Sequence, residues 1–178
     1  VLAIDAIQAL GRMKLNVDAM GIDFMSCGGF KGLLSGFGIG FLWCDRGIRE
    51  QIKPVCAGMQ GVCASPEAPE VFPQAPELQL IEDGRRFEIG SQNSYGITML
   101  EKSLEFLLRL GTDNIERHIL MLEDCLRNKI HSPCLHLLTP EDPRRRSGIV
   151  VGYYPEALYD KFKQILCDKH IFLTHRPG

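Results

Sequence analysis

The chain has 178 residues, 45% of them hydrophobic, and its 20 Lys and Arg residues against 22 Asp and Glu give a net charge of −2. The length and hydrophobic content suffice for one substantial core or two smaller ones. The absence of a net positive charge argues against nucleic acid as the main partner. Charged residues interrupt each apolar stretch before it reaches the length of a membrane span, so we expect no membrane partner.

The seven cysteines are odd in number and lack paired Cys-x-x-Cys motifs. This favours reduced thiols in a cytoplasmic protein over a disulfide framework or a zinc site. No basic region precedes the apolar residues 1–4, so the N-terminus does not resemble a signal peptide. These residues look like a strand already in progress, and both ends look cut, as expected of a fragment.

The first fifty residues predict alternating strands and helices. Short apolar runs predict buried strands, of the kind found in parallel sheets, at residues 1–4, 22–27 and 39–44. A short helix at residues 6–10 should follow the first strand. Asp45 should cap a helix that runs to about Ile52 after the third strand.

Proline spacing and helical periodicity organise the middle of the chain. Five prolines, Pro54, Pro66, Pro69, Pro73 and Pro76, exclude long helices, so residues 54–82 should form an extended loop. An apolar stripe from Ile97 to Leu108 predicts a long helix between Asn93 and Gly111.

The last third predicts a separate α+β unit. Asp113 and Glu116 form a capping box for a helix to about Ile130. Further elements should follow in the order strand, helix, strand, at residues 149–151, from Pro155 to Leu166, and at residues 171–174. We therefore predict three parts: a large-domain segment at 1–53, the loop and connecting helix at 54–112, and a small α+β domain at 113–178.

Three polar side chains should emerge at the carboxyl edge of the sheet, where open α/β sheets bind ligands. Asp5 follows the first strand, Gln8 lies one helical turn further on, and Lys31 follows the second strand through a Gly-Gly turn. A carboxylate, an amide and an amine suit pyridoxal phosphate (PLP), which needs an amine for its imine and a carboxylate beside its pyridine nitrogen. Taken singly, however, Asp5 would be a helix cap, and Gln8 and Lys31 solvated surface residues.

Four segments in order carry a family resemblance. They are Asp5 to Gly11, similar to Asp-Ala-x-Gln-x-x-Gly; Asp23 to Leu42, similar to a lysine loop and its following strand; Arg86 to Asn93, similar to Arg-Phe-Glu-x-Gly-Thr-x-Asn; and Ser147 to Val150, similar to the start of a small domain. The chain thereby resembles the C-terminal half of the class V aminotransferase and cysteine desulfurase family of fold type I PLP enzymes.

The resemblance implies an α/β fold: the end of a PLP-transferase-like large domain with a mainly parallel sheet, and a small α+β C-terminal domain. It assigns the pyridine nitrogen to Asp5, the ring hydroxyl to Gln8 and the imine to Lys31. It assigns the cofactor phosphate, across a dimer interface, to Ser91, which occupies the threonine position. It also implies an enzyme that acts on an amino acid or amine, as a homodimer with shared active sites.

The reaction type stays open at this point. Gly28, Gly29 and Phe30 precede Lys31 where the family often has Ser or His, which counts against a desulfurase. The N-terminal half and the arginine for the substrate carboxylate are absent from the chain, so activity of the chain by itself is not implied. The alternative is a non-catalytic dimerisation or binding module that retains the fold. The combination of Asp5, Lys31 and Ser91 counts against it.

Overall fold

The computed structural model describes residues 1–63 and 79–175, and its contacts divide the chain into two units, Val1–Ile115 and Glu116–Gly178. Four prolines of the predicted loop lie outside the described residues: Pro66, Pro69, Pro73 and Pro76. Within the described part of the chain, no helix combines the length and the apolar character needed to span a bilayer.

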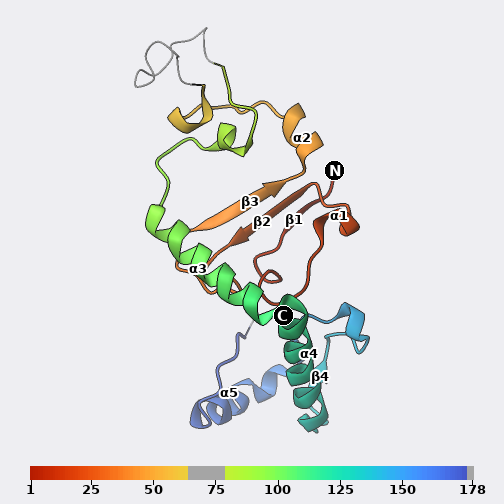
Figure 1. The fold of residues 1–178 in the computed structure, drawn as a ribbon. Helices are drawn as coiled ribbons and strands as arrows, with labels where there is room; N and C mark the ends of the chain where they lie inside the picture. Colours follow the sequence, from red (N-terminus) through yellow and green to blue (C-terminus); the bar gives the residue numbers. More distant parts are fainter. Residues whose placement is uncertain (64–78, 176–178) are drawn as a thin grey trace. The chain divides into compact units, whose positions relative to one another are not determined.

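The first unit contains a three-stranded sheet formed by β1 (Ala3–Asp5), β2 (Phe24–Gly28) and β3 (Gly40–Cys44), with β2 in the middle (Figure 1). The three predicted strands are confirmed to within two residues. β1 and β2 are parallel, with Asp5 opposite Ser26. The carboxyl ends of these two strands therefore meet at one edge of the sheet.

The expectation of a mainly parallel sheet holds only for β1 and β2. β3 runs antiparallel to β2, with Gly28 opposite Gly40. The connection at residues 29–39 is shorter than a parallel crossover requires, so the chain turns back beside the strand it has just left.

The predicted helix at residues 6–10 is wrong, because this segment forms a succession of turns. A single helical turn, α1 (Val17–Met20), follows later. The helix after β3 is confirmed as α2 (Arg46–Gln51). The Asp45 carboxylate caps it by accepting hydrogen bonds from the Gly47 and Ile48 amides, at 2.9 and 3.3 Å.

The long helix is also confirmed, as α3 (Ser94–Leu110). Gly111, at φ +85°, then separates it from α4 (Thr112–Lys129), which begins one residue before the predicted cap at Asp113. Asp113 lies instead in the first turn of α4, and its carboxylate accepts a hydrogen bond from the Lys14 ammonium at 2.8 Å. Two short 3-10 helices, Met59–Gly61 and Gly84–Phe87, complete the described part of this unit.

Two small clusters form the core of the first unit. Ala6, Ile22 and Met25 form one, beside β1 and β2. The other contains Cys27 of β2, Leu33 of the turn after β2, and Leu107 of α3. The second cluster therefore fixes the Lys31 turn between the central strand and α3.

The second unit contains a two-stranded antiparallel sheet of β4 (His136–Leu137) and β5 (Gly152–Tyr153), followed by α5 (Tyr159–Asp168). Short 3-10 helices occur at Pro143–Arg145 and Glu156–Leu158. The strand predicted at 149–151 is thus displaced along the chain, and β4 was not predicted. Pro155 caps a 3-10 helix instead of starting α5, and residues 171–174 form no strand.

A buried carboxylate joins α4 to the loop before β5. Glu123 accepts hydrogen bonds from Arg127 Nε at 2.9 Å and from the Gly148 amide at 3.1 Å, and Arg146 Nη1 lies 3.6 Å away. The Glu123 side chain is 0% exposed and that of Arg146 only 5%. Arg127 also donates to the Thr139 carbonyl at 3.0 Å. Charge pairing, more than apolar contact, therefore fixes this loop.

Replacing Glu123 with alanine should destabilise the second unit strongly, because the buried Arg127 would lose its carboxylate partner. Arg146 would keep only Asp124, which lies 2.6 Å from its Nη1. We expect Glu123→Ala to lower the free energy of unfolding by about 3 kcal/mol, measured by urea denaturation. Glu105→Gln removes only the exposed pair with Lys102 and should change it far less. Equal effects of the two substitutions would contradict the role given to Glu123.

Candidate functional site

Asp5 is the last residue of β1 and is exposed at the carboxyl edge of the sheet. Its Oδ1 accepts a hydrogen bond from the Ile7 amide at 3.0 Å. This bond shapes the turn that carries Gln8, whose side chain is also exposed. Among residues 1–63 and 79–175, no other hydrogen bond engages the Asp5 carboxylate. Asp5 therefore organises a turn, and its second oxygen is free to accept a donor.

Lys31 lies in the turn that follows β2 and is half-buried. Its ammonium lies 5.9 Å from the centre of the Phe30 ring. Within the described ranges it makes no ion pair and no hydrogen bond. The Lys31 amine is therefore not engaged by a carboxylate of the described residues and can react with a ligand.

The turns that carry Gln8 and Lys31 are in backbone contact. A Cβ atom at Gly11, at φ +81°, would overlap the Gly32 carbonyl oxygen, and a Cβ at Gly32 would overlap the Leu10 carbonyl oxygen. Only glycine at both positions allows the two backbones to approach this closely. The contact gathers the turns of Asp5, Gln8 and Lys31 at one edge of the sheet.

The sequence predicted this edge but missed the residues that create the contact. The sequence places Gly11 only at the end of the Asp-Ala-x-Gln-x-x-Gly motif and indicates no separate role for Gly32. The available signal was a glycine directly after the candidate lysine, since an isolated glycine often marks a close backbone approach.

Ser91 lies apart from these residues in the hydrogen-bond network. It is exposed and precedes the first residue of α3, Ser94, by three positions. The cap of α3 is Asn93, whose side chain accepts a hydrogen bond from the Gly96 amide at 3.0 Å. Asn93, and not Ser91, therefore caps the helix. No hydrogen bond joins Ser91 to Asp5, Gln8 or Lys31 in the described part of the chain.

Cys27 lies beside the two strand ends and is 5% exposed. Burial, and next the negative charge of Asp5, raise the pKa of the Cys27 thiol. Its Sγ lies 3.4 Å from the Gly28 carbonyl oxygen. A buried thiol with a raised pKa is a poor nucleophile, so Cys27 is a packing residue here.

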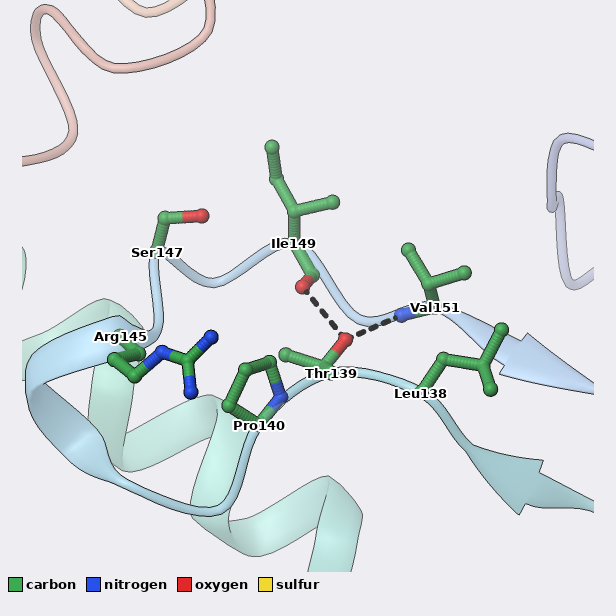
Figure 2. Close-up of a pocket in the computed structure, with 7 residues that line it drawn as sticks. All are labelled: Leu138, Thr139, Pro140, Arg145, Ser147, Ile149 and Val151. Carbon is green, nitrogen blue, oxygen red and sulfur yellow. Dashed lines mark hydrogen bonds between the residues drawn. The ribbon is translucent and has the colours of Figure 1, made fainter.

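The second unit has an open pocket, but its lining contains none of the candidate cofactor residues Asp5, Gln8, Lys31 and Ser91 (Figure 2). It is lined by Leu138, Thr139, Pro140, Arg145, Ser147, Ile149 and Val151. The Thr139 hydroxyl is already engaged, donating to the Ile149 carbonyl at 3.2 Å and accepting from the Val151 amide at 2.7 Å. No group of three or more potential metal ligands occurs among residues 1–63 and 79–175.

Comparison with known proteins relates this geometry to one family. The model of the aminotransferase class-V family matches residues 1–175. A "probable cysteine desulfurase" of Methanothermobacter thermautotrophicus is 30% identical over 129 residues, which are 72% of this chain and 30% of that protein. A second, of Pyrococcus abyssi, is 27% identical over 120 residues, or 66% of this chain and 27% of that protein. The chain spans about a third of the length of these relatives.

Solved structures share the fold. The apo cysteine desulfurase of Thermococcus onnurineus superposes with a TM-score of 0.78 at 24% identity, covering 97% of this chain and 41% of that one. A mutant of C-DES with glycine covalently linked to its PLP cofactor gives 0.76 at 20% identity, covering 95% and 42%.

The fold is thus the mixed α/β fold of the cysteine desulfurases. With the match over nearly its whole length, the chain belongs to the aminotransferase class-V family.

The donor set at the sheet edge fits PLP, the cofactor of homologues in this family. An aldehyde needs an amine, which Lys31 offers without a competing carboxylate. A pyridine nitrogen needs a carboxylate, and Asp5 has one oxygen free. Gln8 can donate an amide hydrogen from the turn between them.

The glycine contact gives a direct test of this site. Gly32→Ala should force the two turns apart, lowering the free energy of unfolding by about 2 kcal/mol and abolishing PLP-induced absorbance. Gly84→Ala is the matched control, because a Cβ there meets nothing within 4 Å. Unchanged PLP uptake by Gly32→Ala would show that the close approach is not needed to form the site.

Proposed function

We propose that this chain is part of a PLP-dependent enzyme of the class-V aminotransferase type, acting on an amino acid or amine, with Lys31 as the residue that attaches the cofactor. The observation that carries the proposal is the backbone contact at Gly11 and Gly32, which holds the Asp5–Gln8 turn against the Lys31 turn. Lys31 and Asp5 are separated by 26 positions in the sequence, so their turns meet only through the fold.

Each residue has a distinct task in this proposal. Asp5 keeps a proton on the pyridine nitrogen, because a carboxylate stabilises the adjacent cation. Gln8 donates a hydrogen bond to the ring hydroxyl, and Lys31 provides the amine and later moves protons at the substrate carbon. Bound PLP supplies the electron sink that this chemistry requires. Cys27, with its raised pKa, stays a neutral thiol and does not compete for the aldehyde.

Within the family, the names of the relatives suggest a particular substrate. The relatives that match this chain carry cysteine desulfurase in their names, so cysteine is the first substrate to test. The residues before Lys31, Gly28, Gly29 and Phe30, depart from the family's usual Ser or His. This departure favours an aminotransferase or lyase over a desulfurase as the reaction. Product analysis with cysteine distinguishes them, since a desulfurase releases alanine and keeps the sulfur atom bound to the enzyme.

We also propose a homodimer with shared sites. Apolar side chains next to Lys31 are exposed in this chain, including Leu34 at 60% and Phe37 at 83%. Phe37 stacks on Phe30 with ring centres 4.7 Å apart, so the two rings form one continuous apolar surface. A second copy that covers this surface would bring its own Ser91 hydroxyl to the cofactor phosphate. Among residues 1–63 and 79–175, Ser91 makes no hydrogen bond to Asp5, Gln8 or Lys31, which is consistent with a role in the partner's site.

Borohydride reduction in the presence of PLP tests the proposed function directly. In the intact protein, peptide mapping should place the pyridoxyl group on Lys31, because the turn that carries this lysine is packed against the Asp5–Gln8 turn. A label on another lysine, such as Lys14 or Lys53, would overturn the assignment. Failure to label any lysine would favour the non-catalytic dimerisation or binding module.

Asp5→Asn separates binding from chemistry. A neutral amide stabilises a protonated pyridine far less than a carboxylate does, so turnover should fall by about 100-fold or more while PLP still binds. The turn is retained, because an asparagine oxygen can also accept the Ile7 amide. Steady-state kinetics and PLP titration measure the two effects. Turnover near that of the wild type would reduce Asp5 to a turn residue.

A further inference from the structure

The Asn93 carboxamide bonds in two directions. Its Oδ1 accepts from the Gly96 amide at 3.0 Å and so caps α3. Its Nδ2 donates to the Gly38 carbonyl oxygen at 3.3 Å, across 55 positions of sequence. A helix cap needs only an acceptor, and Ser, Thr or Asp would serve equally well. The amide nitrogen is the feature that asparagine adds, and it bonds to Gly38, in the segment between Lys31 and β3.

The Gly38 end of this bond leads back to Lys31. Gly38 has φ +75° and precedes Ile39, whose carbonyl accepts from the Gly29 amide at 2.8 Å. A Cβ at Gly29 would lie 3.0 Å from Ile39 Cγ2, so the two residues are in tight contact. Gly29 is two residues before Lys31. The position of Gly38 and Ile39 is therefore transmitted to the start of the lysine turn.

The first turn of α3 also packs closely against Ile39. A Cβ at Gly96 would lie 2.6 Å from Asn93 Nδ2 and 3.0 Å from Ile39 Cβ. The start of α3 and the segment between Lys31 and β3 are therefore closely packed. Ser91 lies two residues before Asn93, on the chain segment that enters this contact.

We infer that Asn93 is a positioning residue that fixes the Ser91 segment against the loop of Lys31. The inference rests on the proposed function, in which Lys31 serves its own chain's site and Ser91 serves the partner's. One carboxamide then sets the geometry of both sites: the lysine loop in one and the phosphate contact in the other. Asn93 itself touches neither the substrate nor the cofactor.

Asn93→Ser tests the bond to Gly38 while keeping the helix cap, since serine caps well but cannot reach the Gly38 carbonyl. In the intact protein, PLP affinity should fall about tenfold, because the hydrogen bond to Gly38 is lost and the Lys31 turn is no longer held in place. Without PLP, hydrogen exchange in residues 29–40 should become faster. Asn16→Ser is the matched control, because Asn16 caps α1 by accepting from the Ala19 amide at 2.9 Å. If Asn93→Ser folds poorly, Asn93→Asp replaces it, because aspartate caps at least as strongly and also lacks the donor.

Mixed dimers separate the two effects of Asn93. When a Lys31→Ala chain pairs with an Asn93→Ser chain, Lys31 remains only in the Asn93→Ser chain, whose own Lys31 turn is altered. When the double variant Lys31→Ala/Asn93→Ser pairs with wild type, Lys31 remains only in the wild-type chain. The Ser91 that contacts the phosphate in that site then comes from the double variant. PLP affinity should fall in both pairs, and by less than in the Asn93→Ser homodimer.

The outcomes separate this inference from the function on which it rests. A fall in only one mixed dimer, or an Asn93→Ser effect no larger than that of Asn16→Ser, would overturn the coupling. A wild-type protein that attaches no PLP at Lys31 would instead overturn the proposed function, and the inference with it.

Discussion

The contact between Gly11 and Gly32 is the constraint on which the candidate site depends. Hydrogen bonds between β1 and β2 align the strand ends, but they do not fix the turns beyond them. Those turns carry Gln8 and Lys31, and they meet where a side chain at either glycine would overlap a carbonyl oxygen. The close approach gives the site a fixed backbone, on which Asp5 adds one hydrogen bond to shape its own turn. The chemistry therefore relies on two residues that carry no functional group.

Burial explains why the strands were predicted correctly, and the contact between Gly11 and Gly32 explains why the helix after β1 was not. Apolar runs identify β1, β2 and β3 because burial selects β-branched, aliphatic and aromatic side chains in strands. Direction is not encoded in such a run, so the apolar pattern does not show that β3 is antiparallel to β2. The short connection at residues 29–39 accounts for that direction. The predicted helix after β1 failed for a different reason. Its residues have helical propensity, but the backbone must bend at Gly11 to contact Gly32, and tertiary packing overrides propensity.

The second unit was harder to predict because its stabilising interactions are polar. A helical stripe locates α4, yet nothing in the sequence around Glu123 indicates that this carboxylate is buried beneath Arg127 and Arg146. Burial of a charge is decided by partners distant in sequence, here across 23 positions, and local periodicity cannot show them. The strand at residues 149–151 was displaced for a related reason. The backbone of this segment is engaged by Thr139, so regular pairing starts only at Gly152.

Desolvation links the site to the surface around it. A lysine reacts with an aldehyde only as the neutral amine, and an amine loses its proton more readily when it is shielded from water. Lys31 is half-buried in this chain, and the surface beside it is formed by exposed apolar rings of Phe30 and Phe37. Exposed apolar surface of this kind is typical of a site that contacts another surface. On the proposed function, the second copy that covers the two rings also excludes water from the Lys31 amine. Dimerisation and cofactor attachment therefore depend on the same apolar contact.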